Sequence, residues 1–84
     1  MDLGATCTIG QILLTAAPFA QGVIANGQYL DRTQYTALFD MIGTTYGDDP
    51  NGQGILFRVP DLTGAAPNGL TYSICDLGVF PAGR

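Results

Sequence analysis

The stretch QYTALFDMIGTTYGDD at residues 34–49, followed by FRVPDL at residues 57–62, decides the fold. Its first half places apolar side chains at the i, i+3, i+4 and i+7 positions of one helical face, namely Tyr35, Leu38, Phe39 and Ile42. Arg32, Thr36 and Asp40 face the other way. The spacing predicts a short amphipathic helix, which is stable only when a sheet or a neighbouring chain covers its apolar stripe.

Signals for both ends of this helix are present in the sequence. We expect the helix to begin at Asp31, whose carboxylate would accept the N–H of Gln34 in a variant of the capping box. Leu30 and Tyr35 stand at the positions of a hydrophobic staple. Gly43 ends the helix, because glycine takes the left-handed C′ conformation without steric cost.

A turn-rich loop and a strand follow the helix. The segment DDPNGQG, residues 48–54, consists almost entirely of residues that favour turns. ILFRVPDL, residues 55–62, predicts a strand that stops at Pro60, because proline cannot donate to a β-ladder. Asp61 is placed to accept hydrogen bonds from the backbone N–H groups that come after it.

Three further segments predict short strands. GQILLT at residues 10–15 gives the first, and VIA at residues 23–25 runs into Asn26-Gly27, the pair best suited to a type I′ hairpin turn. LTYSIC at residues 70–75 alternates apolar and polar side chains, which predicts a half-buried strand with Ser73 on its polar face. We also expect the apolar tail, Val79 and Phe80, to dock on the domain. The expected fold class is α+β, a small mixed module of short β-strands with one amphipathic helix.

Composition limits both the size and the partners of this protein. A chain of 84 residues forms one domain with a thin core, and 46% apolar residues leave more apolar surface than such a domain can hide, which predicts an oligomer. The net charge of −4 gives no basic face for nucleic acid. We expect an N-terminal arm at residues 1–9 and a single domain at residues 10–84. The start MDLGATCTIG shows no Sec signal, and no segment is long and apolar enough to span a bilayer.

Two cysteines lie near opposite ends of the chain. A bond between Cys7 and Cys75 would close a long loop, and chain-entropy estimates give such a bond roughly 4 kcal/mol. Two buried free thiols are the alternative, because free cysteine behaves as a small apolar side chain. The sequence leaves both open.

No group of residues predicts catalysis or a cofactor. The chain lacks histidine, the commonest general base and transition-metal ligand. Asp48, Asp49 and Asn51 could supply oxygens to calcium, but their spacing departs from the EF-hand loop, so a solvated turn is the preferred interpretation. Ser73 has no histidine to activate it.

Four tyrosines allow a sugar-binding surface. Aromatic faces and hydroxyl groups suit carbohydrate, but Tyr35 and Tyr72 fall on faces predicted to be buried, so core or subunit contacts explain them better. Tyr29 and Tyr46 remain as candidates for contact with a glycan.

Taken in order, the segments GQILL, PFAQG, ANGQYL, YTALFDMIGTTYGDD, FRVPDLTG and LTYSICDLGVFP resemble the phage tail collar family, which includes microcystin-dependent-protein-like chains and the collar region of phage short tail fibres. The resemblance runs from about Gly10 to Pro81. Its most specific parts are Asn26-Gly27-Gln28, Leu38-Phe39 through Gly43-Thr44-Thr45-Tyr46-Gly47, and Phe57 with Pro60-Asp61-Leu62-Thr63-Gly64. Met1-Asp2 and the closing GVFP also resemble free-standing members, so we expect a complete small protein.

The sequence departs from the family pattern in two places. FAQGVIANGQ lacks the Pro-x-Gly and aromatic residue that usually precede the Asx-Gly-Gln segment. The Leu-Arg-Gly-Arg of the family is Leu62-Thr63-Gly64-Ala65 here, which removes two arginines. Contacts made by those arginines therefore cannot be carried over.

The resemblance implies a structural and attachment element of tail fibres and related injection machines, found as interlocked trimers without established catalytic residues. The expected partners are further copies of this chain, other tail fibre proteins and a host-surface glycan, and the expected location is the virion or the extracellular space. A second hypothesis is a host-encoded extracellular filament of domesticated collar modules, since open heterologous contacts give filaments. A third is a carbohydrate-binding module that uses Tyr29, Tyr46 and the acidic loop.

Overall fold

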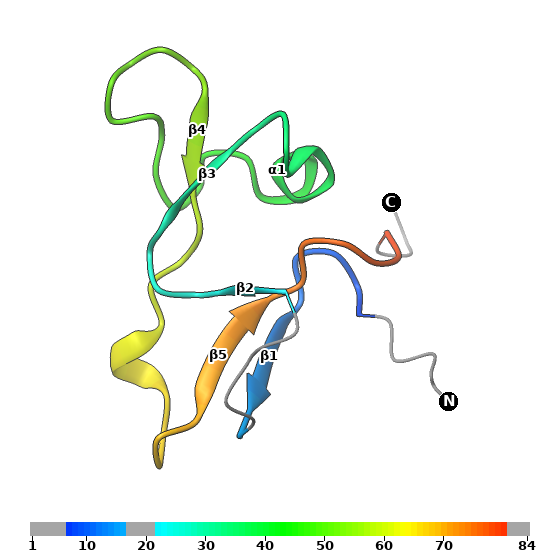
Figure 1. Cartoon of the computed structure of the whole chain (residues 1–84), viewed down its shortest axis with the longest axis vertical. Coiled ribbons are helices and arrows are strands. Elements are labelled where there is room, and N and C mark those ends of the chain that lie inside the picture. Colours follow the sequence, from blue (N-terminus) through cyan, green and yellow to red (C-terminus); the bar gives the residue numbers. More distant parts are fainter. Residues whose placement is uncertain (1–6, 17–21, 81–84) are drawn as a thin grey trace.

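The computed structural model of this protein describes residues 7–16 and 22–80, which form two small antiparallel sheets and one helix (Figure 1). One sheet has the order β1-β5-β2 and the other pairs β3 with β4. The elements in chain order are β1 (Ile12–Thr15), β2 (Val23–Ile24), β3 (Tyr29–Asp31), α1 (Thr36–Ile42), β4 (Leu56–Arg58), the 3-10 helix η1 (Thr63–Ala65) and β5 (Thr71–Ile74). Short antiparallel strands and one helix agree with the expected α+β class.

The core lies where α1 and the two sheets meet. Its fully buried side chains include Leu38 from α1, Phe57 from β4 and Ile74 from β5. Leu38 is the buried residue of the helix stripe, while Tyr35, Phe39 and Ile42 are partly buried and pack against the core cluster. The rings of Phe39 and Phe57 meet edge to face, with centroids 5.2 Å apart. The stripe therefore packs on a sheet of its own chain.

The helix begins later than the sequence predicts, so the capping box at Asp31 is wrong. Asp31 ends β3 opposite Leu56, and its carboxylate accepts the N–H of Thr33 at 2.8 Å and the Thr33 hydroxyl at 2.6 Å. Thr33 thus takes the carboxylate that was expected to cap Gln34. The helix starts at Thr36, after an N-cap residue, Tyr35, that makes no side-chain capping bond.

Arg32 was also expected to face away from the helix stripe, and this is wrong as well. Its guanidinium carbon lies 4.4 Å from the centre of the Phe39 ring. The long arginine side chain folds back over the aromatic ring, where a cation is attracted to the π face.

Gly43 ends the helix as expected, but with a different backbone conformation. Its φ of 55° is positive, yet its ψ of −139° lies outside the left-handed helical region. The N–H of Thr45 donates to the carbonyl of Ile42 at 3.3 Å. Together these values describe a type II′ turn with glycine at its first central position.

The hairpin expected at Asn26-Gly27 does not form, because the strands on its two sides belong to different sheets. β2 pairs with β5, whereas β3 pairs with β4. Of this pair only Gly27 has a positive φ, at 79°, so the type I′ geometry is excluded. The segment between Ile24 and Tyr29 instead carries the chain from one sheet to the other (Figure 1).

Strand β5 is more deeply buried than the alternation of its residues predicts. Ser73 was assigned to a polar face but is fully buried. β5 is the central strand of its sheet, and Ser73 stands opposite Leu13 of β1 on one side and Ile24 of β2 on the other. A central strand flanked by two apolar neighbours hides even its polar residue.

The two ends of the described chain are tied together. Thr8 forms a parallel bridge with Val79, and Ile9 N–H donates to the Val79 carbonyl at 2.9 Å. The backbone of the tail therefore docks, whereas the side chains of Val79 and Phe80 stay exposed. Cys7 and Cys75 are joined by a disulfide with their Cα atoms 6.0 Å apart. Residues 7–9, placed in an N-terminal arm by the sequence, contribute the buried Cys7 and Ile9.

Candidate functional site

The segments that carry the family resemblance, ANGQ and PDLTG, lie side by side in the structure. Asn26 forms an antiparallel bridge with Asp61, and Gly27 N–H donates to the Pro60 carbonyl at 3.3 Å. The hydroxyl of Thr63 donates to Asp61 at 2.7 Å, and its N–H donates to the same oxygen at 3.2 Å. We call this group, Asn26, Gly27, Pro60, Asp61 and Thr63, the motif junction.

Hydrogen bonds at the motif junction stabilise the ionised form of Asp61. The hydroxyl of Thr63, then the N–H of Thr63, and last the positive charge of Arg58 lower the pKa of the Asp61 carboxyl, and desolvation opposes them. Asp61 therefore accepts local hydrogen bonds that hold the turn after Pro60.

Arg58 of β4 contacts the motif junction on one side and the turn after α1 on the other. Its Nε donates to the Gly27 carbonyl at 2.7 Å, and its Cζ lies 5.7 Å from the centre of the Tyr29 ring. On its other side, the Gly47 carbonyl accepts the N–H of Arg58 at 3.1 Å. A β-carbon on Gly47 would stand 2.8 Å from the Arg58 β-carbon, so Gly47 must be glycine for this close approach. Gly64 in η1 is open to solvent, and nothing in the structure explains its glycine.

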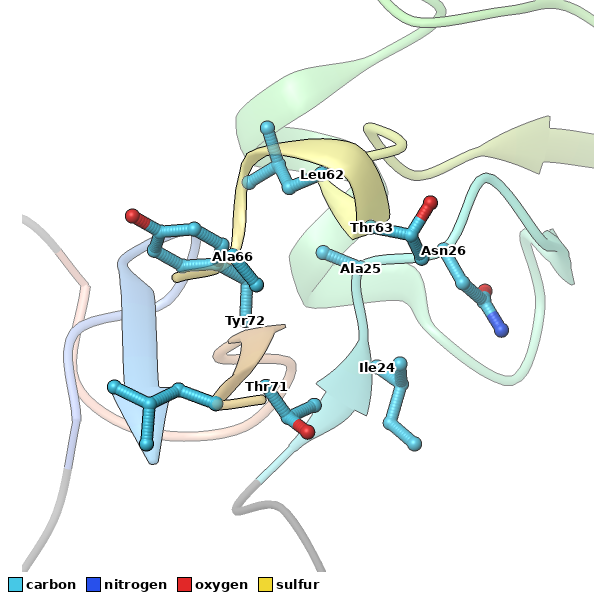
Figure 2. A pocket seen from close by; sticks show the side chains of 9 residues that line it. Ile24, Ala25, Asn26, Leu62, Thr63, Ala66, Thr71 and Tyr72 are labelled. Carbon is cyan, nitrogen blue, oxygen red and sulfur yellow. The ribbon is translucent and has the colours of Figure 1, made fainter. Parts of the chain in front are cut away.

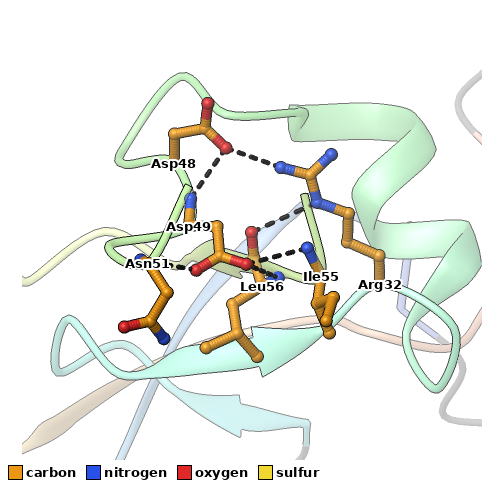
Figure 3. A network of polar contacts seen from close by, with 6 residues as sticks. All are labelled: Arg32, Asp48, Asp49, Asn51, Ile55 and Leu56. Atoms are coloured by element: carbon orange, nitrogen blue, oxygen red, sulfur yellow. Dashed lines mark hydrogen bonds and ion pairs between the residues drawn. The ribbon is translucent and has the colours of Figure 1, made fainter. Parts of the chain in front are cut away.

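The acidic loop forms a second polar cluster, centred on Arg32 and the two aspartates Asp48 and Asp49 (Figure 3). Nη2 of Arg32 pairs with Oδ1 of Asp48 at 2.6 Å, and Nε of Arg32 donates to the Leu56 carbonyl at 3.1 Å. Oδ1 of Asp48 also accepts the N–H of Asp49 at 2.7 Å. Arg32 thus ties the loop to the start of β4.

Asp49 is a buried carboxylate that holds the loop closed. It accepts backbone N–H groups from Asn51 at 2.8 Å, Ile55 at 2.8 Å and Leu56 at 3.2 Å (Figure 3). The N–H of Ile55, followed by that of Asn51, lowers the pKa of the Asp49 carboxyl, while desolvation opposes the shift. The carboxylates of Asp48 and Asp49, which were considered for calcium, therefore accept backbone N–H groups of their own loop. Within the described ranges no group of three metal-ligating side chains forms.

Of the two candidate glycan contacts, Tyr29 is the first residue of β3 and Tyr46 lies in the turn that follows α1. Tyr29 is 41% exposed and lies opposite Arg58, and Tyr46 is 47% exposed and precedes Gly47. The guanidinium of Arg58 over the Tyr29 ring leaves the aromatic side chain partly available to solvent. The arrangement presents aromatic surface beside a cation.

A pocket of about 260 Å³ lies between η1 and strands β2 and β5 (Figure 2). Apolar side chains dominate its lining, which consists of Ile24, Ala25, Asn26, Leu62, Thr63, Ala66, Leu70, Thr71 and Tyr72. The N–H of Leu62 donates to the carbonyl of Ala25 at 2.8 Å and joins the two walls. The sequence did not reveal this pocket, because it depends on how η1 folds over the sheet.

Comparison with known families is consistent with this geometry. The family model of the phage tail collar domain matches residues 10–67, more than half of the chain. This protein belongs to the phage tail collar domain family. No curated protein and no solved structure gives a match to the chain. The family resemblance inferred from the sequence is confirmed.

The collar match contains β1 to β4, α1, η1 and the complete motif junction, and it ends before β5. The collar domain is a structural domain of phage tails and is not known as an enzyme. Membership therefore indicates a structural role of the tail fibre kind and a place in a virion. Across residues 7–16 and 22–80, no helix has the length and apolarity needed to cross a membrane.

Proposed function

We propose that this collar protein is a non-enzymatic structural and attachment element that assembles with other copies of itself at a tail fibre. The observation that carries the proposal is the collar match over residues 10–67. The polar groups of the motif junction and of the acidic loop support it, because they bind backbone and one another. Residues used in this way shape the module.

The apolar surface supports self-association. Large apolar side chains are exposed at several places among the described residues: Ile12, Leu14, Ile24, Tyr29, Tyr46, Ile55, Leu77, Val79 and Phe80. Apolar side chains that are exposed next to one another, such as Ile12 and Leu14 on one face of β1, favour contact with other molecules. Other copies of this chain and other tail fibre proteins are the partners that we propose.

The assembly state of the purified protein tests this proposal. Light scattering after size-exclusion chromatography, combined with negative-stain imaging, measures it with and without reductant. A discrete trimer is the result expected for a tail fibre component. A monomer at every concentration, or turnover of a substrate by the pure protein, would contradict the proposal.

Our second candidate is the subunit of an extracellular filament built from a domesticated collar module. The exposed side chains of Leu77, Val79 and Phe80 favour it, because they gather where the two ends of the described chain meet. An apolar end can join the next subunit head to tail, and such contacts propagate into fibres. Long regular fibres in the stained images would support this candidate over a closed trimer.

Attachment to a host-surface glycan is compatible with either assembly. Tyr29 beside Arg58, together with exposed Tyr46, is the surface that favours it. Binding on a glycan array that Tyr46→Ala abolishes would support it. A blank array would count against it and would leave the structural role unaffected.

A further inference from the structure

Strand β1 has one open edge among residues 7–16 and 22–80. Within these residues β1 pairs with β5 alone, in a register that places Ile12 opposite Ile74 and Leu14 opposite Tyr72. The N–H of Cys75 donates to the Gln11 carbonyl at 2.9 Å, so Gln11 turns its carbonyl toward β5. Backbone groups alternate in direction along an antiparallel strand. Ile12 and Leu14 therefore direct their N–H and C=O groups outward.

The other edge of the same sheet is closed. The Ile24 carbonyl, on the outer side of β2, accepts the N–H of Asn26 at 3.0 Å and the Gln28 side-chain amide at 3.0 Å. In the second sheet, Asp48 bridges to Phe57 and covers the outer side of β4. In the part of the chain that the structure describes, β1 is thus the strand of the three-stranded sheet whose outer edge is available for pairing.

The open edge lacks the charges and prolines that keep many edge strands apart. β1 consists of Ile12, Leu13, Leu14 and Thr15, without a charge or a proline. Lysine, proline and inward-pointing charges are the usual protection against edge-to-edge pairing. Ile12 and Leu14 are instead 39% and 45% exposed and lie on one face of the sheet.

We propose that β1 of one copy pairs antiparallel with β1 of a second copy, about a two-fold axis at Leu13. Ile12 then stands opposite Leu14 of the second copy, and each pair exchanges two backbone hydrogen bonds. The edge is self-complementary, because Ile12 and Leu14 each offer one donor and one acceptor, and the side chains of Ile12, Leu13 and Leu14 face only apolar side chains of the second copy. The contact places no charge against a like charge, which suits a chain of net charge −4. Because a two-fold contact joins copies in pairs, it is separate from the contact that would close a trimer, and it rests on the self-association proposed above.

Cross-linking through introduced cysteines tests this register. Leu13 would face Leu13 of the second copy as a non-hydrogen-bonded pair. Their Cα atoms would lie about 4.5 Å apart, within the range that a disulfide spans. Ile12 would lie diagonally across from Ile12 of the second copy. Their Cα atoms would be roughly 9 Å apart, too far for a disulfide. Cys7 and Cys75 are bonded to each other, so the introduced cysteine supplies the free thiol.

The experiment compares Leu13→Cys with Ile55→Cys in the full chain, under mild oxidation followed by non-reducing electrophoresis. Ile55 is 47% exposed and lies on the loop before β4, so it controls for random collision. We expect Leu13→Cys to form covalent dimers at least about tenfold faster, because pairing raises the local thiol concentration. Ile12→Cys mixed with Leu14→Cys should likewise give heterodimers faster than either variant alone gives homodimers.

The cross-linking and association results distinguish the β1 contact from self-association in general. Oligomers in light scattering, with Leu13→Cys no faster than Ile55→Cys, would overturn the β1 contact and leave self-association standing. Leu14→Lys should weaken association, whereas Ile55→Lys, which adds the same charge at a similarly exposed residue, should not. Equal association of these two lysine variants, each folded by circular dichroism, would also overturn the contact.

Discussion

A β-carbon on Gly27 would stand 2.6 Å from Nη2 of Arg58, and the backbone of Gly27 has a φ of +79°. The same guanidinium donates to the Gly27 carbonyl through Nε at 2.7 Å. Gly27 thus lets the arginine approach the backbone where the two family segments meet. The side chain that is missing from residue 27 leaves the space that Arg58 occupies.

Gly27→Ala should destabilise the domain more than Gly52→Ala. Both glycines have a positive φ, +79° and +71°, and alanine at such a backbone angle costs about 1–2 kcal/mol. At Gly52 nothing lies within 4 Å of the new β-carbon, so only the backbone cost applies. At Gly27 the flexible end of Arg58 must also move, and loss of its hydrogen bond to the Gly27 carbonyl adds roughly 1 kcal/mol. Chemical denaturation of both variants measures the difference, and equal losses would refute the role of Gly27 in seating Arg58.

Phe39→Ala should destabilise the domain by roughly 2–3 kcal/mol, less than the loss of a fully buried phenylalanine, because Phe39 is partly buried. The variant removes the edge contact with Phe57 and the ring beneath Arg32. Tyr46→Ala is the control, because it truncates an aromatic residue that is 47% exposed. Circular dichroism with thermal unfolding compares them. A Phe39→Ala protein that unfolds cooperatively at the temperature of the Tyr46→Ala control would contradict the packing described for α1.

Much of the fold follows from local signals in the sequence. The rest depends on which of several partners a residue binds, including partners from distant parts of the chain. Spacing alone placed Leu38 and Phe39 on the packed face of the helix, and Gly43 marked its end. The start of the helix could not be predicted, because Asp31 had two acceptor roles and the hydroxyl of Thr33 lies nearer. The missed hairpin has a similar cause, since Asn26 meets Asp61 from a distant part of the chain.

The sequence likewise predicted some parts of the candidate site and missed others. Turn chemistry indicated that Asp48 and Asp49 hold a loop, because such residues hydrogen-bond nearby backbone. It did not indicate Arg32 as their partner, which comes from the segment between β3 and α1. Nor did it indicate Arg58, although its two closely packed glycines, Gly27 and Gly47, are visible in the motifs. Glycines at fixed places signal a close approach without naming the residue that approaches.

Acid should destabilise the protein through Asp49. Its pKa in the folded state lies below the ordinary value of 3.8, so the stability it contributes is present above that value and is lost as pH falls through the lower folded pKa. Asp49→Asn should lower the unfolding midpoint at neutral pH and flatten the decline of that midpoint as the pH falls below 3.8. Asp40→Asn, at an exposed position on α1, is the control for loss of one charge. A decline just as steep in Asp49→Asn would show that other carboxyl groups cause the acid sensitivity.

Removal of the disulfide should weaken the domain by roughly 4 kcal/mol, since the bond closes a loop across a sequence separation of 68 residues. The bond also lies beside the junction of the two chain ends, where Val79 N–H donates to the Cys7 carbonyl at 3.0 Å. Cys7→Ser with Cys75→Ser should therefore unfold at a lower temperature than the oxidised protein. Reductant should lower the midpoint of the native protein and leave that of the double variant unchanged. Mass spectrometry of the unreduced protein checks the pairing itself, and free thiols at both positions with an unchanged midpoint under reductant would contradict this account of how the chain ends are held.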